Sequence, residues 1–333
     1  MSSVDDTPDA LARNHTQWAQ ALDQRLPPEV GGPTADETLV HTVPGARGPA
    51  ARGPAAQGYA TTHAADPATL EATWGPLRQH RLRPLIAADN RPQVMAELLT
   101  AWRAVLPQAR GEAPDDVATE AAMLAWPTRD PEMPPVLDAF GFEKTTTLAV
   151  LDRQGMGPRP RSAPPSVRIR PLSPHDADVA AAAQLWLGEV RFDTEHGALN
   201  ERPETAHLLW EEMRRRATAG TDQAWLADDD GRTVALATVD WPDSNAWLAP
   251  RLGPGPFAYI GCVYVQPEYR GTGVGSALVR EVHARIAEAG VPRVALHFAD
   301  HNPISPTFWT SWGYEPLWTM WRASLARFRP AAA

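Results

Sequence analysis

The chain has 333 residues, of which 43% are hydrophobic, so it is long enough for two domains of ordinary size with buried cores. Its net charge of −9 indicates no basic face for nucleic acid or for an anionic membrane surface. Cys262 is the only cysteine, which excludes an intrachain disulfide and a cysteine-based metal cluster.

The histidines and the N-terminus exclude further classes. The ten histidines show no metal-binding spacing, so we predict no metal site. No apolar run approaches the ~20 residues that a membrane-spanning helix needs, and the first residues lack the basic and apolar segments of a signal peptide. We therefore expect a cytoplasmic protein with neither a membrane nor a nucleic-acid partner.

The first half of the chain begins with a helical pattern over residues 5–25, so we assign residues 1–30 to an N-terminal helix. Residues 44–58 are rich in Pro, Gly and Ala, which is typical of a surface loop or a disordered arm. The strand-like residues 84–90 then lead into a helical pattern that no glycine opens. A second Pro- and Gly-rich segment, at 154–166, indicates a linker between a domain at 31–153 and another at 167–328.

The second half alternates between strand and helix patterns. Asp229-Asp230-Gly231 separates two alternating apolar runs, which is a strong hairpin signal. The expected strands are 167–172, 223–229, 232–241, 261–265, 293–299 and 314–325, and the expected helices are 175–190, 203–219, 276–289 and 304–312. This order predicts an α/β fold with a mixed sheet.

A glycine-rich turn follows the strand at 261–265. It contains Gly271, Gly273 and Gly275 and opens a helix, where free backbone N–H groups and the helix dipole favour an anion such as a phosphate. A P-loop is excluded because Ser276-Ala277 follows Gly275 in place of Lys-Ser/Thr. A dinucleotide fingerprint is disfavoured because its third glycine would fall on Ser276.

Arg270, Gly273 and Gly275 resemble the pyrophosphate loop of the GNAT superfamily of acyl-CoA-dependent N-acyltransferases. A second segment strengthens the resemblance, because Asn302, Phe308-Trp309 and Gly313-Tyr314 are similar to a further motif of that family at the expected spacing. The resemblance implies a GNAT acetyltransferase domain at 167–328 and acetyl-CoA as co-substrate.

An internal repeat links the two halves. Around the second motif, residues 130–143 match residues 302–315 at a constant offset of 172, including Asp130-Pro131 with Asn302-Pro303 and Gly141-Phe142 with Gly313-Tyr314. We therefore predict tandem GNAT-like acyltransferase domains, each a mixed, mostly antiparallel sheet flanked by helices. The first copy lacks the glycines, and Pro92 crowds the equivalent place, so we predict one CoA site.

The resemblance also implies roles for individual residues. Main-chain groups of Val263 and Val265 would pair with pantetheine and polarise the thioester carbonyl. Asn302 would contact the pantetheine arm, and Trp309 would make the acyl pocket tight enough to favour acetyl. The pyrophosphate would be held beside Arg270 by the N–H groups of Gly271, Gly273, Val274, Gly275 and Ser276.

Trp309 departs from the family, in which many members have a tyrosine that protonates the leaving thiolate. Indole cannot act as that acid. Either another group replaces it, with Tyr314, His301 and Ser305 as candidates, or none is needed, because a thiol with a pKa of about 8.5 is a fair leaving group. An amine like lysine, with a pKa near 10.4, needs a base. The candidates for the base are His297, Asp300, His301, Asp193, Glu195 and His196.

From these candidates we select His301, Tyr314 and Glu195 as catalytic residues. The expected function is transfer of an acetyl group from acetyl-CoA to a primary amine, expected to be that of a small molecule, by direct attack on the thioester. The alternatives are a protein-lysine acetyltransferase, a CoA-binding sensor or scaffold, and a purely structural assembly. The chain is expected to be a monomer or a homodimer.

Overall fold

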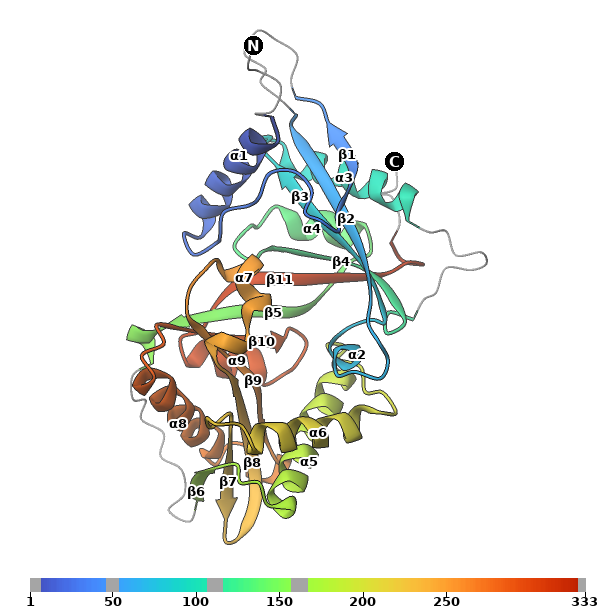
Figure 1. Cartoon of the computed structure of the whole chain (residues 1–333). Coiled ribbons are helices and arrows are strands. Elements are labelled where there is room, and N and C mark those ends of the chain that lie inside the picture. The colour runs from blue at the N-terminus through green and yellow to red at the C-terminus, as the bar shows by residue number, and fades with distance from the viewer. Residues whose placement is uncertain (1–6, 46–53, 107–115, 157–166, 329–333) are drawn as a thin grey trace.

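The computed structural model describes residues 7–45, 54–106, 116–156 and 167–328 (Figure 1). The first half contains α1 (Thr7–Leu22), β1 (Thr38–Val43), β2 (Ala56–Ala64), α2 (Glu71–Trp74), β3 (Arg78–Ile86), α3 (Arg91–Val105), β4 (Glu120–Pro127), α4 (Met133–Ala139) and β5 (Glu143–Asp152). The second half contains β6 (Val167–Pro171), α5 (Asp176–Glu195), α6 (Thr205–Ala217), β7 (Ala224–Asp229), β8 (Arg232–Asp240), α7 (Ala249–Leu252), β9 (Phe257–Val265), α8 (Val274–Glu288), β10 (Arg293–Ala299), α9 (Ser305–Ser311) and β11 (Glu315–Ser324).

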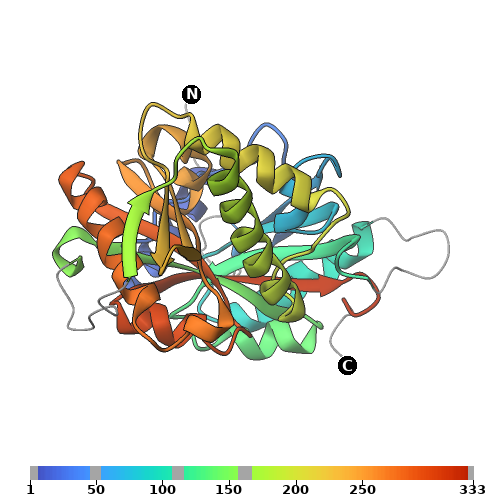
Figure 2. The ribbon, with the colours of Figure 1, turned by 90° about the horizontal axis from the view of Figure 1, so that it is seen from below.

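One sheet runs through the part of the chain that the structure describes. Its 11 strands follow the order β1-β2-β3-β4-β11-β5-β10-β9-β8-β7-β6, so the two halves share a continuous layer (Figure 1). Helices cover both of its faces, as the view from below shows (Figure 2). The sheet is mixed, because β3 pairs with β4 and β9 with β10 in parallel while the other neighbours are antiparallel.

The internal repeat is present in the structure, where α4 and α9, and likewise β5 and β11, occupy ranges 172 residues apart. The two halves also exchange their last strands. β5 lies between β10 and β11, and β11 lies between β4 and β5, all in antiparallel pairs. Each half therefore completes its sheet with a strand from the other half.

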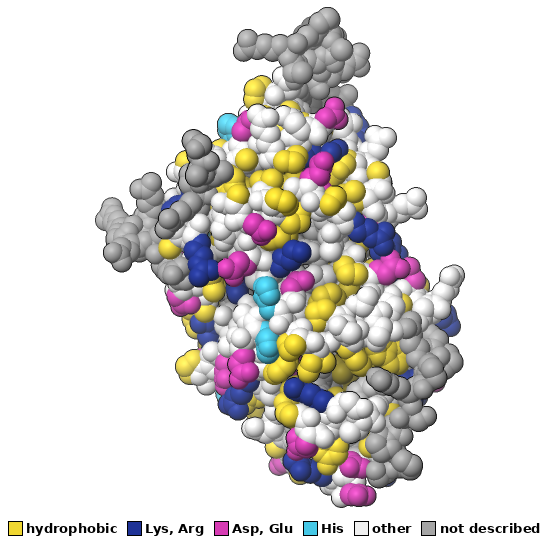
Figure 3. Space-filling view, turned by 180° about the vertical axis from the view of Figure 1, so that it is seen from behind, with side chains coloured by type: hydrophobic (Ala, Val, Ile, Leu, Met, Phe, Trp, Pro, Cys, Tyr) yellow, Lys and Arg dark blue, Asp and Glu magenta, His cyan; other side chains and the backbone are white. Residues whose placement is uncertain are grey.

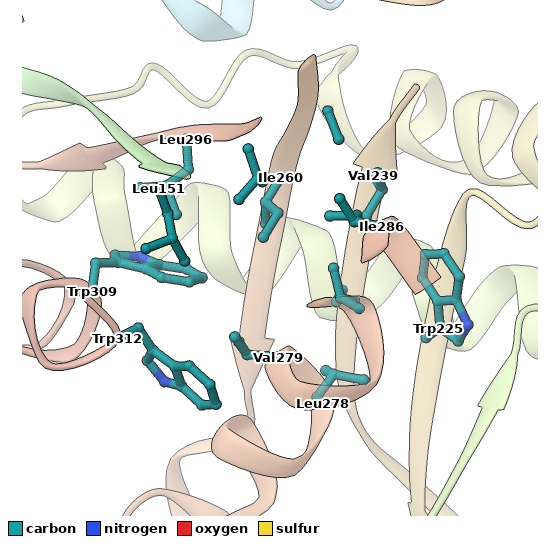
Figure 4. Close-up of a cluster of buried hydrophobic side chains, with 14 of the residues drawn as sticks. Leu151, Trp225, Val239, Ile260, Leu278, Val279, Ile286, Leu296, Trp309 and Trp312 are labelled. Carbon is teal, nitrogen blue, oxygen red and sulfur yellow. The ribbon is translucent and has the colours of Figure 1, made fainter. Parts of the chain in front are cut away.

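Alternation along the strands of the second half builds two cores. Leu226 and Leu236 face the layer of α5 and α6, whereas Trp225 and Val239 face α8 and α9. Figure 4 shows the second of these cores, with Trp225 and Val239 on one side and Trp309 on the other. Successive side chains of a strand point to opposite faces of the sheet, and both faces of this sheet are buried, so each strand contributes to two cores.

The β7–β8 hairpin has the turn expected from the sequence. Asp230 and Gly231 both have positive φ, 46° and 82°, as a two-residue type I′ turn requires.

Several segments differ from the expected boundaries; β9, for example, begins at Phe257 and not at residue 261. Residues 56–58 belong to β2 rather than to a loop, because Ala56 is buried in the first-half core, while residues 46–53 lie outside the described part. The helix expected at 175–190 runs to Glu195, since no proline or second glycine interrupts it. Position 188 of this helix requires glycine, because a Cβ there would lie only 2.8 Å from the Tyr264 ring. Most of the proposed linker, residues 157–166, is also outside the described residues.

The strands β9 and β10 separate at one end. Their parallel pairing ends at Ile260 and Leu296, but β9 continues to Val265 and β10 to Ala299. Beyond the last pair, β9 is paired with β8 and β10 with β5. Within the described residues, the facing edges of the two separated strands therefore keep backbone groups that make no ladder bonds.

The first half separates in the same way, and there α1 fills the gap. The parallel pairing of β3 with β4 ends at Leu82 and Leu124. Nδ1 of His15, on α1, lies 3.0 Å from the carbonyl oxygen of Ile86 and 3.1 Å from its backbone nitrogen. The His15 ring also lies 5.9 Å from that of Trp126, so α1 contacts the separated ends of both strands.

Candidate functional site

A cavity of about 300 Å³ lies where β9 and β10 separate. α5, α8 and α9 close it on the sides. The lining residues come from five segments: Glu189, Phe192 and Asp193; 260–265; Tyr269, Arg270, Gly271, Gly273, Gly275 and Ser276; 296–298; and Asn302, Ile304, Ser305, Phe308 and Trp309. All the expected cofactor-binding residues except Val274 therefore line one cavity.

The glycine-rich turn has the geometry that its sequence requires. Gly271 and Gly273 have φ values of 78° and 100°, which residues with a Cβ rarely adopt. Gly275 is needed for another reason, because a Cβ there would lie 3.2 Å from Cγ2 of Val265. Val274 points into the core and is fully buried. The turn thus brings the first turn of the 15-residue helix α8 directly against the end of β9.

Arg270 lies across the mouth of the cavity. Its guanidinium group sits 4.5 Å from the centre of the Phe192 ring and 5.5 Å from that of Tyr264. Its Nε donates a hydrogen bond to the carbonyl oxygen of Val265, at 3.2 Å. The cation is therefore held beside the turn by two aromatic rings and a backbone carbonyl group.

Asn302 connects two walls of the cavity. Its Oδ1 accepts hydrogen bonds from the backbone nitrogens of Ile304 and Ser305, at 2.9 and 3.0 Å, at the start of α9. Its Nδ2 donates to Oδ1 of Asp193 on α5, at 2.7 Å. The side chain thus positions α9 against α5, a role that the resemblance did not imply.

Two carboxylates reach the cavity from the same face of α5. Glu189 and Asp193 are four residues apart, which is one helical turn. Burial raises the pKa of Glu189 well above its ordinary value, and the negative charge of Asp193 adds to the effect. Burial also raises the pKa of Asp193, although the hydrogen bond from Asn302 opposes it. The wall formed by α5 is therefore acidic and poorly solvated.

His297 forms a third polar element of the wall. Its Nδ1 lies 3.0 Å from the hydroxyl of Tyr259, and the exposed Trp247 stacks on its ring at 6.2 Å. Burial, together with the positive charge of Arg251, lowers its pKa to about 4. His297 is therefore a neutral imidazole at physiological pH.

Trp309 forms the apolar end of the cavity. It is 6% exposed, and its ring packs edge-on against those of Phe308 and Tyr314, at 5.0 and 5.2 Å. In Figure 4 it lies with Leu151, Leu296 and Ile260. Cys262 is buried, as expected for a packed thiol, and burial raises its pKa well above the ordinary value.

None of the three selected catalytic residues lines the cavity. Tyr314 is 1% exposed and its hydroxyl lies 2.9 Å from Nε2 of His283, in the core between α8 and β11. His301 and Glu195 are exposed. Among the other candidates, the structure brings Asp193, His297 and Ser305 to the cavity but not Asp300 or His196.

The sequence analysis missed Glu189. It lies within the apolar stretch of α5, and helical spacing from Asp193 would have placed both carboxylates on one face. Asp193 itself lies beyond residue 190, where this helix was expected to end.

The comparisons with known proteins fit this geometry. Residues 189–314 match the family model described as "Acetyltransferase (GNAT) family". This part of the chain is a GNAT domain. Its matched range begins at Glu189 and ends at Tyr314, and so includes every residue that lines the cavity.

A curated relative is the mycothiol acetyltransferase of Kocuria rhizophila, 27% identical over 207 residues. The match covers 59% of this chain and 63% of that protein. The chain thus matches less than two thirds of the length of this relative.

Among solved structures, the GCN5-related N-acetyltransferase from Sphaerobacter thermophilus is similar with a TM-score of 0.53 and 16% identity. The match covers 84% of this chain and 79% of that one, and it supports a shared fold. A tandem GNAT protein from the clavulanic acid biosynthesis pathway matches 98% of this chain and 97% of its own, at 14% identity and a TM-score of 0.45.

Two further properties follow from the described residues. None of their helices is long and apolar enough to cross a membrane. They also contain no group of three or more His, Cys, Asp or Glu side chains that could hold a metal ion.

On the face shown in Figure 3, acidic and basic side chains are interspersed, without a continuous basic area.

Proposed function

We propose that the cavity binds acyl-CoA, with the diphosphate at the N-terminus of α8 and the pantetheine arm between β9 and β10. The free backbone edges of residues 261–265 and 297–299 suit the amide groups of an extended arm. The glycine turn suits a diphosphate, because the backbone N–H groups at the start of α8 are available to it. A side chain at position 275 would crowd this place, since a Cβ there would lie 3.2 Å from Cγ2 of Val265. Arg270 supplies a cation at the same end.

The strand separation also supports a place for the thioester. Gly261 interrupts the register of β9 with β8, because Thr238 pairs with Cys262 while Val239 pairs with Ile260. Such a bulge redirects backbone groups away from the ladder. An N–H group here would polarise the thioester carbonyl and stabilise the charge that develops on it.

We infer that the reaction is transfer of an acetyl group to the primary amine of a small molecule. The buried Trp309 and the partly buried Phe308 limit the space for the acyl chain, which favours acetyl. The curated relative is named for acetylation of mycothiol, which supports a small-molecule acceptor. No acid replaces the family tyrosine in this account, because a thiolate with a conjugate pKa of about 8.5 leaves without one.

The single observation that carries the proposal is the continuous cavity from the glycine turn to the separated strands. It is tested by measuring thiol release from acetyl-CoA against a panel of small primary amines and a lysine-containing peptide. The proposal predicts release that requires an amine and is fastest with a small molecule. Binding of CoA without release by any acceptor would instead support a sensor, and fastest release with the peptide would support a protein-lysine acetyltransferase.

A further inference from the structure

Glu189 is a buried acid without a complete set of partners. Its Oε2 is inaccessible to solvent and makes no hydrogen bond within the described structure. A buried carboxylate oxygen without a partner is costly, because the group has lost its water and gained no replacement. Glu189 also lines the cavity, so a ligand bound there lies beside this carboxyl group.

The groups around Glu189 provide no cation for it. Asp193 and Trp186 flank it on α5, where a weak hydrogen bond from the Trp186 indole opposes the rise of the Glu189 pKa. Tyr259 and Cys262 lie near it on β9. Arg216, one of three arginines at the end of the neighbouring helix α6, already binds two carboxylates and lies over the Trp186 ring.

The two ion pairs of Arg216 are close. They join it to Glu212 at 2.7 Å and to Asp240 at 2.6 Å, and its guanidinium carbon lies 5.4 Å from the centre of the Trp186 ring. The acidic wall therefore has an unmatched negative charge at Glu189 when that group is ionised.

We propose that Glu189 binds the ammonium group of the acceptor and takes its proton, and that the acceptor is a small cationic amine. This inference rests on the proposed acetyl transfer. The proton moves from the ammonium to the Glu189 carboxylate, and the freed nitrogen attacks the thioester carbon. The C–N bond forms, the C–S bond breaks with its electrons on sulfur, and CoA leaves as a thiolate. The second nitrogen proton passes to the solvent.

The environment suits this role. A carboxylate in a site that disfavours its charge takes a proton from an ammonium more readily than one in water, provided that it is ionised at the working pH. The raised pKa of Glu189 makes its carboxylate a stronger proton acceptor than an ordinary one. Asp193, one turn further along α5, adds a second negative group that attracts a cation and disfavours an anionic acceptor.

The test compares Glu189→Gln with Glu211→Gln. Glu211 is on the neighbouring helix α6, its side chain is 56% exposed, and it lies outside the cavity, so it is a matched control. With the best amine of the panel, Glu189→Gln is expected to lower kcat/KM about 100-fold at pH 7 and to recover at least tenfold of that loss at pH 9, where more of the amine is neutral. Glu211→Gln is expected to stay within twofold of the unaltered protein.

A second measurement separates this inference from the proposed transfer. Calorimetry with the amine panel, in the presence of acetyl-CoA, is expected to show at least tenfold weaker binding to Glu189→Gln and unchanged binding to Glu211→Gln. This difference would support recognition by Glu189 even if no acceptor released thiol. Equal amine affinity, or no binding of any amine cation to the unaltered protein, would overturn the inference.

Folding and cofactor controls complete the test. The Glu189→Gln change removes a buried charge while keeping the side-chain shape, so its Tm is expected to equal or exceed that of the unaltered protein. Its acetyl-CoA affinity is expected to stay within twofold. A lowered Tm with a parallel loss of acetyl-CoA binding would assign Glu189 a structural role and overturn the proposal.

Discussion

Asn302 and Tyr314 both direct their polar atoms to partners inside the protein. Asn302 ties the start of α9 to Asp193, and the hydroxyl of Tyr314 binds the ring of His283. Burial raises the pKa of Tyr314 well above its ordinary value, which makes it a poorer acid. Its hydroxyl therefore serves stability rather than the leaving thiolate.

Tyr314→Phe tests this role at the scale of one atom. The change removes the hydroxyl 2.9 Å from Nε2 of His283 and is expected to lower the free energy of unfolding by about 1 kcal/mol. The acetyl-transfer rate and its pH dependence are expected to stay within twofold. Denaturant unfolding and initial rates of thiol release measure the two effects, and a tenfold slower rate in the folded variant would restore Tyr314 as the acid.

At the scale of elements, α1 occupies in the first half the place that the cavity occupies in the second. His15 contacts the end of β3, and Trp18 packs 5.4 Å from Trp126 on β4. The helix that follows, α3, begins with Arg91-Pro92, and the Arg91 guanidinium lies 4.6 Å above the Trp18 ring. In the first half, Arg91-Pro92 thus stands where the second half has glycines, and α1 fills the space that a ligand with a diphosphate would need.

The contact between His15 and Ile86 makes stability depend on pH. Burial lowers the pKa of His15 from 6.5 to about 4. The unfolded chain therefore binds a proton at a higher pH than the folded protein does, and stability falls as the pH decreases from about 6.5 toward 4. At pH 5 this one group is expected to cost about 2 kcal/mol relative to pH 7.5.

Denaturant unfolding of His15→Asn at the two pH values measures this effect. The variant is expected to lose about 2 kcal/mol less than the unaltered protein between pH 7.5 and pH 5, because Asn does not titrate. His207→Asn, at a histidine whose side chain is 70% exposed, is the control and is expected to keep the full loss. An unchanged loss in His15→Asn would contradict the assignment.

Elements with a local signal could be predicted from the sequence. The Asp230-Gly231 turn, the glycine turn before α8 and the 172-residue repeat all depend on neighbouring residues or on a fixed spacing. The exchange of β5 and β11 could not be predicted, because strand pairing between distant segments leaves no local mark. The position of α1 could not be predicted either, because its sequence pattern indicates a helix but not the gap between β3 and β4 that this helix fills.

The candidate site divides in the same way. The residues of the glycine turn could be predicted, because a glycine in such a turn indicates the local backbone conformation directly. Gly271, Gly273 and Gly275 line the cavity. The three catalytic residues selected from the sequence do not line it, because which side chains meet in space depends on the fold and not on local sequence. Glu195 and Glu189 are on the same helix, yet only Glu189 lies on its inner face.

Across the described part of the molecule, one sheet joins two related halves that differ at the gap between their parallel strands. In the second half the gap between parallel strands is an open cavity, and in the first half a helix from the same chain closes it. The shared strands β5 and β11 hold both halves in one sheet. The account therefore requires one acyl-CoA per chain, bound at the glycine turn of the second half.

Calorimetric titration with acetyl-CoA tests this requirement most directly, using Gly271→Asp and Gly271→Asn. Position 271 has open space around a Cβ and a φ of 78°, which both Asp and Asn tolerate better than most residues, so the two variants differ mainly in charge. We predict one site per chain, and an affinity for acetyl-CoA at least tenfold weaker in Gly271→Asp than in Gly271→Asn, because the carboxylate repels the diphosphate. Two sites per chain, or equal affinities of the two variants, would contradict the account.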